Sequence, residues 1–122
     1  MFINYTNHPS EKWSLKQLEA AQKYGEIHDI PFPVVSPEMG NEELIKIAGN
    51  ELIKITIKKP DCVLCQGEAV LSHYLVSILK ENGIKVVAAC SRRNVNERNE
   101  NGKTIKSIEF EFIQFREYWL YD

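Results

Sequence analysis

Glycine is scarce in this sequence of 122 residues, and the placement of its six glycines excludes two common nucleotide-binding motifs. None of the six falls in a G-x-G-x-x-G or a G-x-x-x-x-G-K-S/T pattern. The glycine-rich backbone cradles of dinucleotide-binding domains and P-loop proteins are therefore unsupported. A phosphate group would have to be held by helix N-termini and side chains instead.

An excess of positive charge is also missing, since 15 Lys and Arg stand against 17 Asp and Glu for a net charge of −2. Proteins that coat long nucleic acids normally carry a net basic face, so we expect no such partner. No apolar run approaches the ~18 residues of a membrane span, and the first residues show no signal-peptide pattern. We therefore expect a cytoplasmic protein without a membrane partner, folded as a single domain over residues 1–122.

Cysteine is limited to Cys62, Cys65 and Cys90, an odd number that predicts reduced thiols. The first two form a C-x-x-C, but residues 61–65 have the apolar composition of a buried strand. Residues three apart on a strand point to opposite faces, so these thiols should diverge and behave as small core residues. No second Cys/His pair accompanies them. We therefore expect no metal ion and no other cofactor.

Apolar runs alternate with capping signals along the chain and predict alternating strands and helices. Strands are predicted over residues 2–5, 26–30, 62–65, 84–90 and 108–112. Helices are predicted from a Ser14 cap to Gly25, from an Asn41 cap through residue 55, and over residues 69–81. The polar run 94–103 is predicted as a mobile loop, with a lid or a dimer arm as alternatives.

This order of elements predicts an α/β fold, because alternating strands and helices form a parallel sheet covered on both faces. We expect a small Rossmann-like three-layer domain with strand order 2-1-3-4-5. The fifth strand should run antiparallel to the fourth, because Asn101-Gly102 is a strong hairpin-turn dipeptide.

The most polar turns lie where such a sheet binds ligands. Ligands bind beyond the carboxyl ends of the strands at the point where strand order reverses, here between the first and third strands. The turns after these two strands and after the fourth supply the candidate ligand-binding residues. They are Thr6, Asn7, His8 and Ser10, then Gln66, Gly67 and Glu68, then Ser91, Arg92 and Arg93.

This set of residues suits an anionic, phosphate-bearing ligand. Two helix N-termini would present free N–H groups to it, and arginine pairs with phosphate through a planar fork of donors. Histidine titrates near neutral pH, so His8 is the candidate general acid or base. Local structural interpretations stay open for each residue. The polar residues of the first turn can serve only to form the turn and to cap a helix. Glu68 can serve only as the cap of the next helix, and Arg92 and Arg93 can be solvated surface residues.

Three segments resemble a group of small bacterial proteins and, more loosely, look like compact CARF-type (CRISPR-associated Rossmann-like) proteins of type III CRISPR systems. They are F-I-N-Y-T-N-H-P-S at 2–10 with Trp13, L-C-Q-G-E at 64–68, and V-V-A-A-C-S-R-R at 86–93 with F-R-E-Y at 115–118. The likeness to the CARF-type group rests on the first strand with its Asn-His-Pro turn and on the Gln-Gly-acidic turn. Some proteins of that group are stand-alone ring nucleases.

The resemblance implies a homodimer that binds a cyclic oligoadenylate across its two-fold axis. It also implies cleavage without a metal, in which a ribose 2′-OH attacks the neighbouring phosphate and leaves a 2′,3′-cyclic phosphate. The residues that carry over are Asn7, His8, Ser10, Gln66, Gly67 and Glu68, with His8 and Glu68 as catalytic candidates. Arg92 and Arg93 rest on the sequence argument alone. Ala69-Val70 departs from the pattern, because no glycine or threonine follows the acidic residue.

Other functions stay open. The same site could belong to a non-enzymatic nucleotide sensor. A small enzyme acting on a nucleotide or sugar phosphate could use Glu68 as nucleophile or as acid and base. The aromatic end around Tyr118, Trp119 and Tyr121 could be an interaction surface or a dimer contact.

Overall fold

The computed structural model describes residues 1–120 and contains a five-stranded sheet in the order β2-β1-β3-β4-β5. The strands are β1 (Phe2–Tyr5), β2 (Ile27–Asp29), β3 (Cys62–Cys65), β4 (Lys85–Glu100) and β5 (Lys103–Glu117). The first four run parallel, and β5 runs antiparallel to β4. The predicted α/β, Rossmann-like fold with strand order 2-1-3-4-5 is confirmed.

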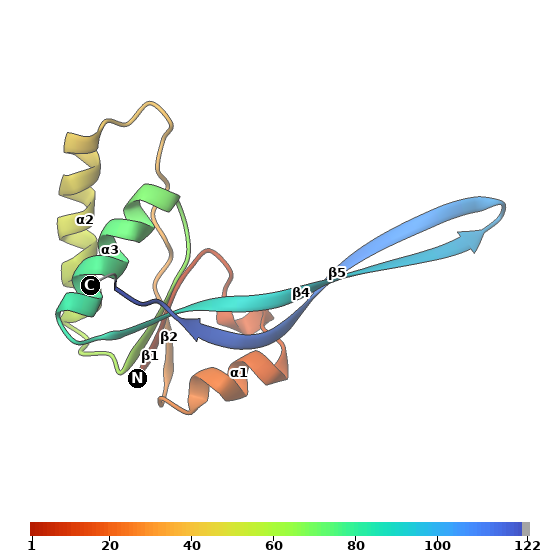
Figure 1. Ribbon diagram of the computed structural model, residues 1–122, viewed down its shortest axis with the longest axis horizontal. Helices are drawn as coiled ribbons and strands as arrows, with labels where there is room; N and C mark the ends of the chain where they lie inside the picture. Colours follow the sequence, from red (N-terminus) through yellow and green to blue (C-terminus); the bar gives the residue numbers. More distant parts are fainter. Residues whose placement is uncertain (121–122) are drawn as a thin grey trace.

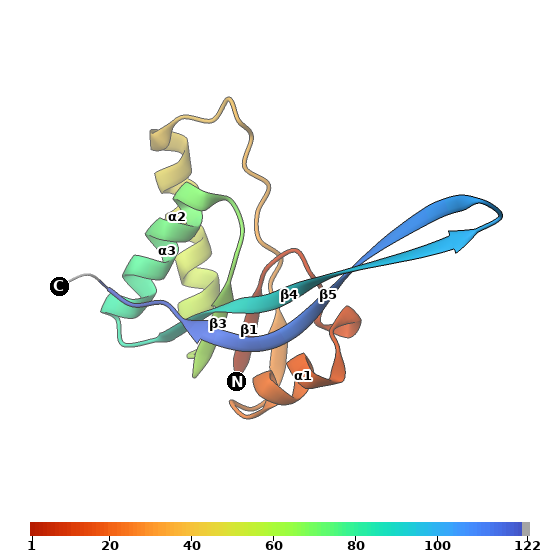
Figure 2. The ribbon, with the colours of Figure 1, turned by 45° about the vertical axis from the view of Figure 1, so that its right-hand side comes forward.

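The helices cover both faces of the sheet and complete a three-layer domain. They are the short 3₁₀ helix η1 (Ser10–Lys12), α1 (Leu15–Gln22), α2 (Asn41–Thr56) and α3 (Ala69–Glu81). Figure 1 and Figure 2 show α2 and α3 together on one side of the strands and α1 on the other. Among the described residues, no helix is long and apolar enough to cross a bilayer.

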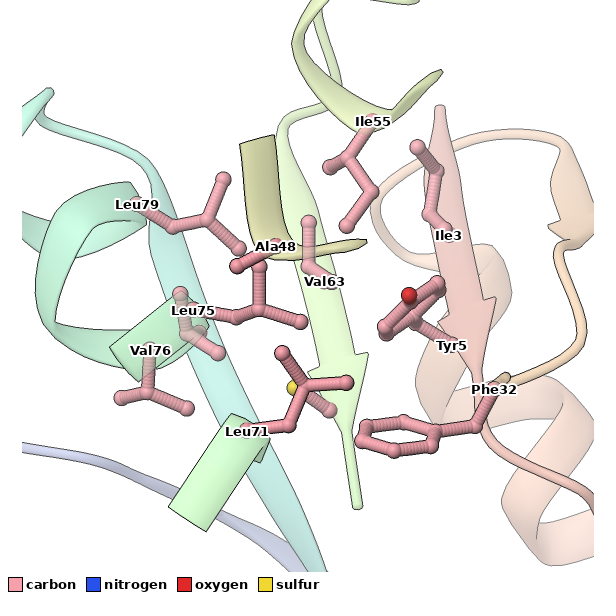
Figure 3. Packing of buried hydrophobic residues seen from close by; sticks show 12 residues of the cluster. Ile3, Tyr5, Phe32, Ala48, Ile55, Val63, Leu71, Leu75, Val76 and Leu79 are labelled. Atoms are coloured by element: carbon pink, nitrogen blue, oxygen red, sulfur yellow. The ribbon is translucent and has the colours of Figure 1, made fainter. Parts of the chain in front are cut away.

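The larger core lies between the sheet and the α2–α3 layer, as Figure 3 shows. Its strand residues Ile3, Tyr5 and Val63 alternate with neighbours that face α1, as the two-residue period of a strand requires. One polar pair interrupts this core: the Tyr5 hydroxyl donates a hydrogen bond of 2.6 Å to the buried Glu51 carboxylate of α2. Burial, with Glu51 adding to it, raises the pKa of Tyr5 above its ordinary value.

The two cysteines of the C-x-x-C lie in different cores, as the strand geometry predicts. Cys62 packs in the smaller core toward α1, and Cys65 packs in the larger core toward α2 and α3. Burial raises the pKa of the Cys62 thiol to about 11 and that of Cys65 to about 12. Both thiols are therefore protonated near neutral pH, which does not suit a nucleophile or a redox pair.

The prediction that residues 94–103 form a mobile loop is wrong. β4 and β5 continue far past the sheet as a two-stranded ribbon that projects from the body of the domain (Figure 1, Figure 2). The pairing runs without interruption from Ser91↔Phe112 to Glu100↔Lys103. The predicted turn closes the ribbon, since Asn101 and Gly102 both have positive φ, at 52° and 74°. We call residues 91–112 the arm.

A β-bulge at the base of the arm aligns its aromatic side chains. The register shifts between Cys90 and Ser91, so that Cys90 pairs with Gln114 but Ser91 pairs with Phe112. The extra residue, Ile113, restores Phe112 and Phe115 to one face although they are three apart in sequence. Their rings lie 4.9 Å apart. The α1 side of the sheet is therefore continuous with one face of the arm.

Two helix starts test the capping predictions. Ser14 caps α1 as expected, since its side chain accepts a hydrogen bond from the Gln17 N–H. The predicted Asn41 cap is wrong: Asn41 is the first residue of α2 and Gly40 occupies the cap position without a side-chain bond. Helix α2 continues through Thr56, one residue past its predicted end.

Candidate functional site

A pocket of about 830 Å³ opens at the carboxyl edge of the sheet, beside the point where strand order reverses. Its volume is within the usual range for small-molecule sites. It lies on the α1 side, between the turn after β1, the start of α1 and the base of the arm. We call it the edge pocket. Its polar lining comprises Thr6, Asn7, His8, Lys12, Ser14, Gln17, Gln66 and Ser91, and its apolar lining Trp13, Leu64, Ala89, Phe110 and Phe112.

The buried Asn4 side chain organises the turn after β1. Its Nδ2 donates to the His8 carbonyl at 2.9 Å and to the Asp29 carboxylate at 3.1 Å. Its Oδ1 accepts a hydrogen bond of 2.7 Å from the Thr6 hydroxyl, and the same hydroxyl oxygen accepts the His8 N–H. Thr6 therefore closes a local turn. Its hydroxyl proton is used within this turn and is not free for the predicted contact with a ligand.

Hydrogen bonds to its backbone fix the position of His8. The turn after β1 therefore determines where its imidazole lies. Its carbonyl accepts from the Asn4 amide and from the Trp13 indole N–H at 3.1 Å. The residue is exposed and lines the edge pocket together with Asn7. Within residues 1–120, it is the one histidine that lines this pocket. The geometry thus places an imidazole in the lining of the cavity, on a backbone held from two sides.

Gln66 joins β3 to β4 and lines the edge pocket. Its Oε1 accepts a hydrogen bond of 3.0 Å from the Ala89 N–H, beyond the last residue pair of these strands. The carbonyl end of its side chain is therefore used in the fold. The amide NH₂ is the end of Gln66 that can donate to a ligand oxygen.

Gly67 and Glu68 have structural roles away from the edge pocket. A Cβ on Gly67 would lie 2.4 Å from the ring of the buried Phe32, so only glycine fits beneath that ring. Both carboxylate oxygens of Glu68 accept N–H groups of α3, from Val70 at 3.0 Å and from Leu71 at 2.7 Å. Glu68 is thus the N-cap of α3. This is the capping role that the sequence analysis gave as the alternative to a role in the site.

The predicted arginine pair is divided between the two faces of the arm. Arg92 pairs with Glu111, and the two side chains approach to 3.9 Å on the face turned away from the edge pocket. Arg93 pairs with Phe110, which lines the edge pocket. Because directly opposed residues share a face, Arg93 lies on the pocket side, one step beyond the rim. Ser10 lies outside the lining, and its N–H donates to Asp29 at 3.0 Å.

Sequence reasoning missed the charged and aromatic parts of the edge pocket. Lys12 is the one charged side chain among the described lining residues, and none of them is acidic. Trp13, Phe110 and Phe112 give the same cavity aromatic walls. The Phe-Glu alternation of residues 108–112 was a usable signal, but it does not tell which ligand or element the phenylalanines face.

A second pocket of about 630 Å³ lies on the opposite face, between α3 and the chain after β5. It is lined by Gln66, Gly67, His73, Tyr118 and Trp119 among others. The Tyr118 hydroxyl donates to the Cys65 carbonyl at 3.0 Å, and burial raises the pKa of Tyr118. Trp119 is 83% exposed. Tyr121, the third residue of the predicted aromatic surface, lies outside the described residues.

The fold and the edge pocket define a small Rossmann-like α/β domain whose last two strands form a projecting arm. The chain belongs to the Uncharacterized protein MJ1673 family, whose model matches residues 1–116. This match includes β1, the first turn, the β3–α3 turn and the whole arm. A comparison with curated proteins finds no match.

Proposed function

We propose that the edge pocket binds a small anionic nucleotide and that this ligand is a cyclic oligoadenylate. The observation that carries the proposal is the composition of the lining: a lysine, amide and hydroxyl groups and aromatic rings, without a carboxylate among the described residues. The lysine side chain suits phosphate oxygens. The aromatic rings suit the faces of purine bases. The choice of a cyclic oligoadenylate within this class rests on the resemblance to CARF-type proteins.

Lys12 and Arg93 supply the positive charge for this ligand. Lys12 stands in the lining and Arg93 stands beside it on the pocket face of the arm. Phe110, which is 72% exposed, lines the same pocket as Lys12 and pairs with Arg93, so it is placed to stack on a base. The proposal includes a cytoplasmic location, because Cys62, Cys65 and Cys90 are free thiols.

Cleavage of the ring is a second function that His8 favours. In this reaction the 2′-OH of a ribose attacks the adjacent phosphorus while the bond to the 5′ oxygen breaks. Neutral His8 accepts the proton of the 2′-OH, and the imidazolium so formed returns it to the departing 5′ oxygen. The products are a 2′,3′-cyclic phosphate and a 5′-OH, and Lys12 stabilises the charge that develops on the phosphate.

The enzyme alternative that uses Glu68 receives less support than the His8 reaction. Both oxygens of Glu68 are held by N–H groups of α3, and Glu68 does not line the edge pocket. A nucleophilic or proton-transferring carboxylate needs a free oxygen directed at the substrate.

Isothermal titration with cyclic tri-, tetra- and hexa-adenylate tests binding, with AMP as the monomeric comparison. We expect one ring size to bind, and Lys12→Ala to weaken it by about tenfold or more, since a hydrogen bond to a charged group contributes about 1.5–3 kcal/mol. Lys16→Ala is the matched control, because Lys16 is exposed nearby on α1 and lines a different cavity. Absence of binding by every ring size would overturn the proposal.

Chromatography of the same nucleotides after incubation with protein and chelator separates a ring nuclease from a sensor. Cleavage predicts a 2′,3′-cyclic phosphate product that His8→Ala abolishes while binding persists. His73→Ala is the control, because His73 lies on α3 in the second pocket. Tight binding with unchanged nucleotide would assign the chain as a sensor and refute the catalytic role of His8.

A further inference from the structure

Beyond its base at Ser91 and Phe112, the arm stands away from the body of the domain with neither face covered (Figure 1, Figure 2). Every residue from Val95 through Glu111 is exposed. Nine residue pairs, from Arg92↔Glu111 to Glu100↔Lys103, extend past Ser91↔Phe112, the last pair that touches the buried core. A two-stranded hairpin is marginally stable by itself in water, so this length of ribbon is expected to pack against something.

The two faces of the arm differ in character. Cross-strand pairing places Arg93, Val95, Glu97, Lys106, Ile108 and Phe110 on one face, the face that continues into the edge pocket. Val95, Ile108 and Phe110 are 50%, 51% and 72% exposed there. We call this the apolar arm face. The opposite face is mostly polar, with Arg92, Asn94, Asn96, Ser107, Glu109 and Glu111, and its one large apolar residue is Ile105.

The apolar arm face is complementary to itself. The Val95–Ile108 pair lies in the middle, with Arg93 and Phe110 two residues toward the body and Glu97 and Lys106 two residues toward the tip. Consider two such faces packed against each other with the arms antiparallel, related by a two-fold axis that passes through the Val95–Ile108 pair. A residue that lies a given number of positions to one side of this pair then faces the residue of the second copy that lies the same number of positions to the other side, on the same strand. Arg93 then faces the second copy's Glu97, and Phe110 faces the second copy's Lys106. Both contacts are favourable, the first as an ion pair and the second as a cation–π contact.

We propose that the apolar arm face binds the same face of a second copy of this chain, with the two arms antiparallel. Side-by-side arms pointing the same way would bring two bodies to one end. α1 covers the sheet on this face. With both bodies at one end, the α1 layers would lie in the space of ~10 Å that two packed sheets leave between them. The antiparallel arrangement puts the two bodies at opposite ends and lets Val95 and Ile108 pack against their counterparts.

The register of this pairing carries the tip of each arm to the other copy's edge pocket. Asn99 and Thr104, four residues beyond the centre, meet the positions of Ser91 and Phe112, which line the pocket. The second copy would thus complete the wall of the edge pocket. This inference does not depend on the proposed ligand, because the contact involves protein residues alone.

Sedimentation velocity over a concentration series, without nucleotide, tests the arrangement. We expect a dimer for the wild-type chain and a dissociation constant raised by about 100-fold or more in Ile108→Glu, which would bury a charge in the interface. Ile105→Glu is the matched control, because Ile105 is an exposed arm isoleucine on the opposite face. Far-UV circular dichroism of both variants confirms that the body is folded.

Charge reversal tests the register of the two arms. Arg93→Glu or Glu97→Arg alone should weaken the dimer, and the double reversal should restore it, because the opposed pair is then rebuilt with its signs exchanged. A monomeric wild-type chain would overturn the proposal and leave the face to a different protein. Equal dissociation by Ile105→Glu and Ile108→Glu would overturn it as well. A dimer whose single and double reversals are equally weakened would contradict the antiparallel register.

Discussion

Replacement of Gly67 by alanine perturbs the point where the β3–α3 turn meets the larger core. The new Cβ would lie 2.4 Å from two ring carbons of Phe32, whereas carbon atoms at their best separation are about 3.5–4.0 Å apart. Phe32 is 3% exposed, and its ring centre lies 5.2 Å from that of Tyr5. The ring therefore has to move by about 1 Å against a packed neighbour.

Overpacking of this kind costs about 1–3 kcal/mol. The contact falls on a buried ring, so we expect a loss near the upper end, about 2–3 kcal/mol in the free energy of unfolding. For a domain of this size that loss corresponds to a decrease in Tm of roughly 6–12 °C. The effect should appear in the absence of any ligand, because it arises from packing.

Thermal and urea unfolding followed by circular dichroism measure the effect. Gly49→Ala is the matched control: Gly49 lies inside α2, nothing lies within 4 Å of its added Cβ, and the change should stabilise the helix by about 0.5–1 kcal/mol. Phe32→Leu should partly rescue Gly67→Ala, giving a double variant more stable than the sum of the two changes predicts. A Gly67→Ala protein as stable as wild type would refute the packing argument.

Three further substitutions test the α3 cap, the turn after β1 and the buried Cys65 thiol. Glu68→Ala removes the cap of α3, so thermal unfolding should show a loss of about 1 kcal/mol that Glu68→Asp partly restores; binding to the edge pocket should be unchanged, and a lost affinity would return Glu68 to the site. Asn4→Ala deletes the hydrogen bonds that fix His8, so urea unfolding should show a loss of about 2–3 kcal/mol; hydrogen exchange of the first turn should also accelerate, and unchanged exchange would contradict its role. Burial raises the pKa of the Cys65 thiol to about 12, so as pH rises above 9 the unfolded state loses the thiol proton first and the folded state is destabilised. Cys65→Ala should flatten this alkaline loss in urea titrations at pH 8–11, and an unchanged slope would contradict the burial of the thiol.

The strand order and most of the secondary structure could be predicted because local signals agreed with one another. The β3 strand and α3 have the predicted bounds of 62–65 and 69–81. Their apolar runs are bounded by polar turns that leave little choice of register. The divergence of the two thiols followed from the two-residue period of a strand alone. The arm escaped prediction because its residues are largely polar, and only the pairing of β4 with β5 over 91–112 makes them strands.

The location of the site could be predicted because the strand order determines it. The residues that line the site could be predicted only in part, because they depend on the hydrogen bonds and packing of individual side chains. Asn7, His8, Gln66 and Ser91 line the edge pocket as the switch-point argument expects. Glu68 is instead held by the helix it caps. Whether Glu68 caps the helix or faces the pocket depends on which N–H groups lie nearest to its carboxylate, and the sequence does not show this.

An NMR titration of the labelled chain with cyclic tri-, tetra- and hexa-adenylate shows whether the edge pocket binds a nucleotide. We predict saturable shifts for one ring size at the backbone amides of Thr6, Asn7, His8, Gln66 and Ser91. Amides of residues that line the second pocket but not the edge pocket, such as His73, Ser77 and Trp119, should stay in place. Shifts confined to that second pocket, or no shift with any ring size, would contradict the assignment of the edge pocket as a nucleotide site.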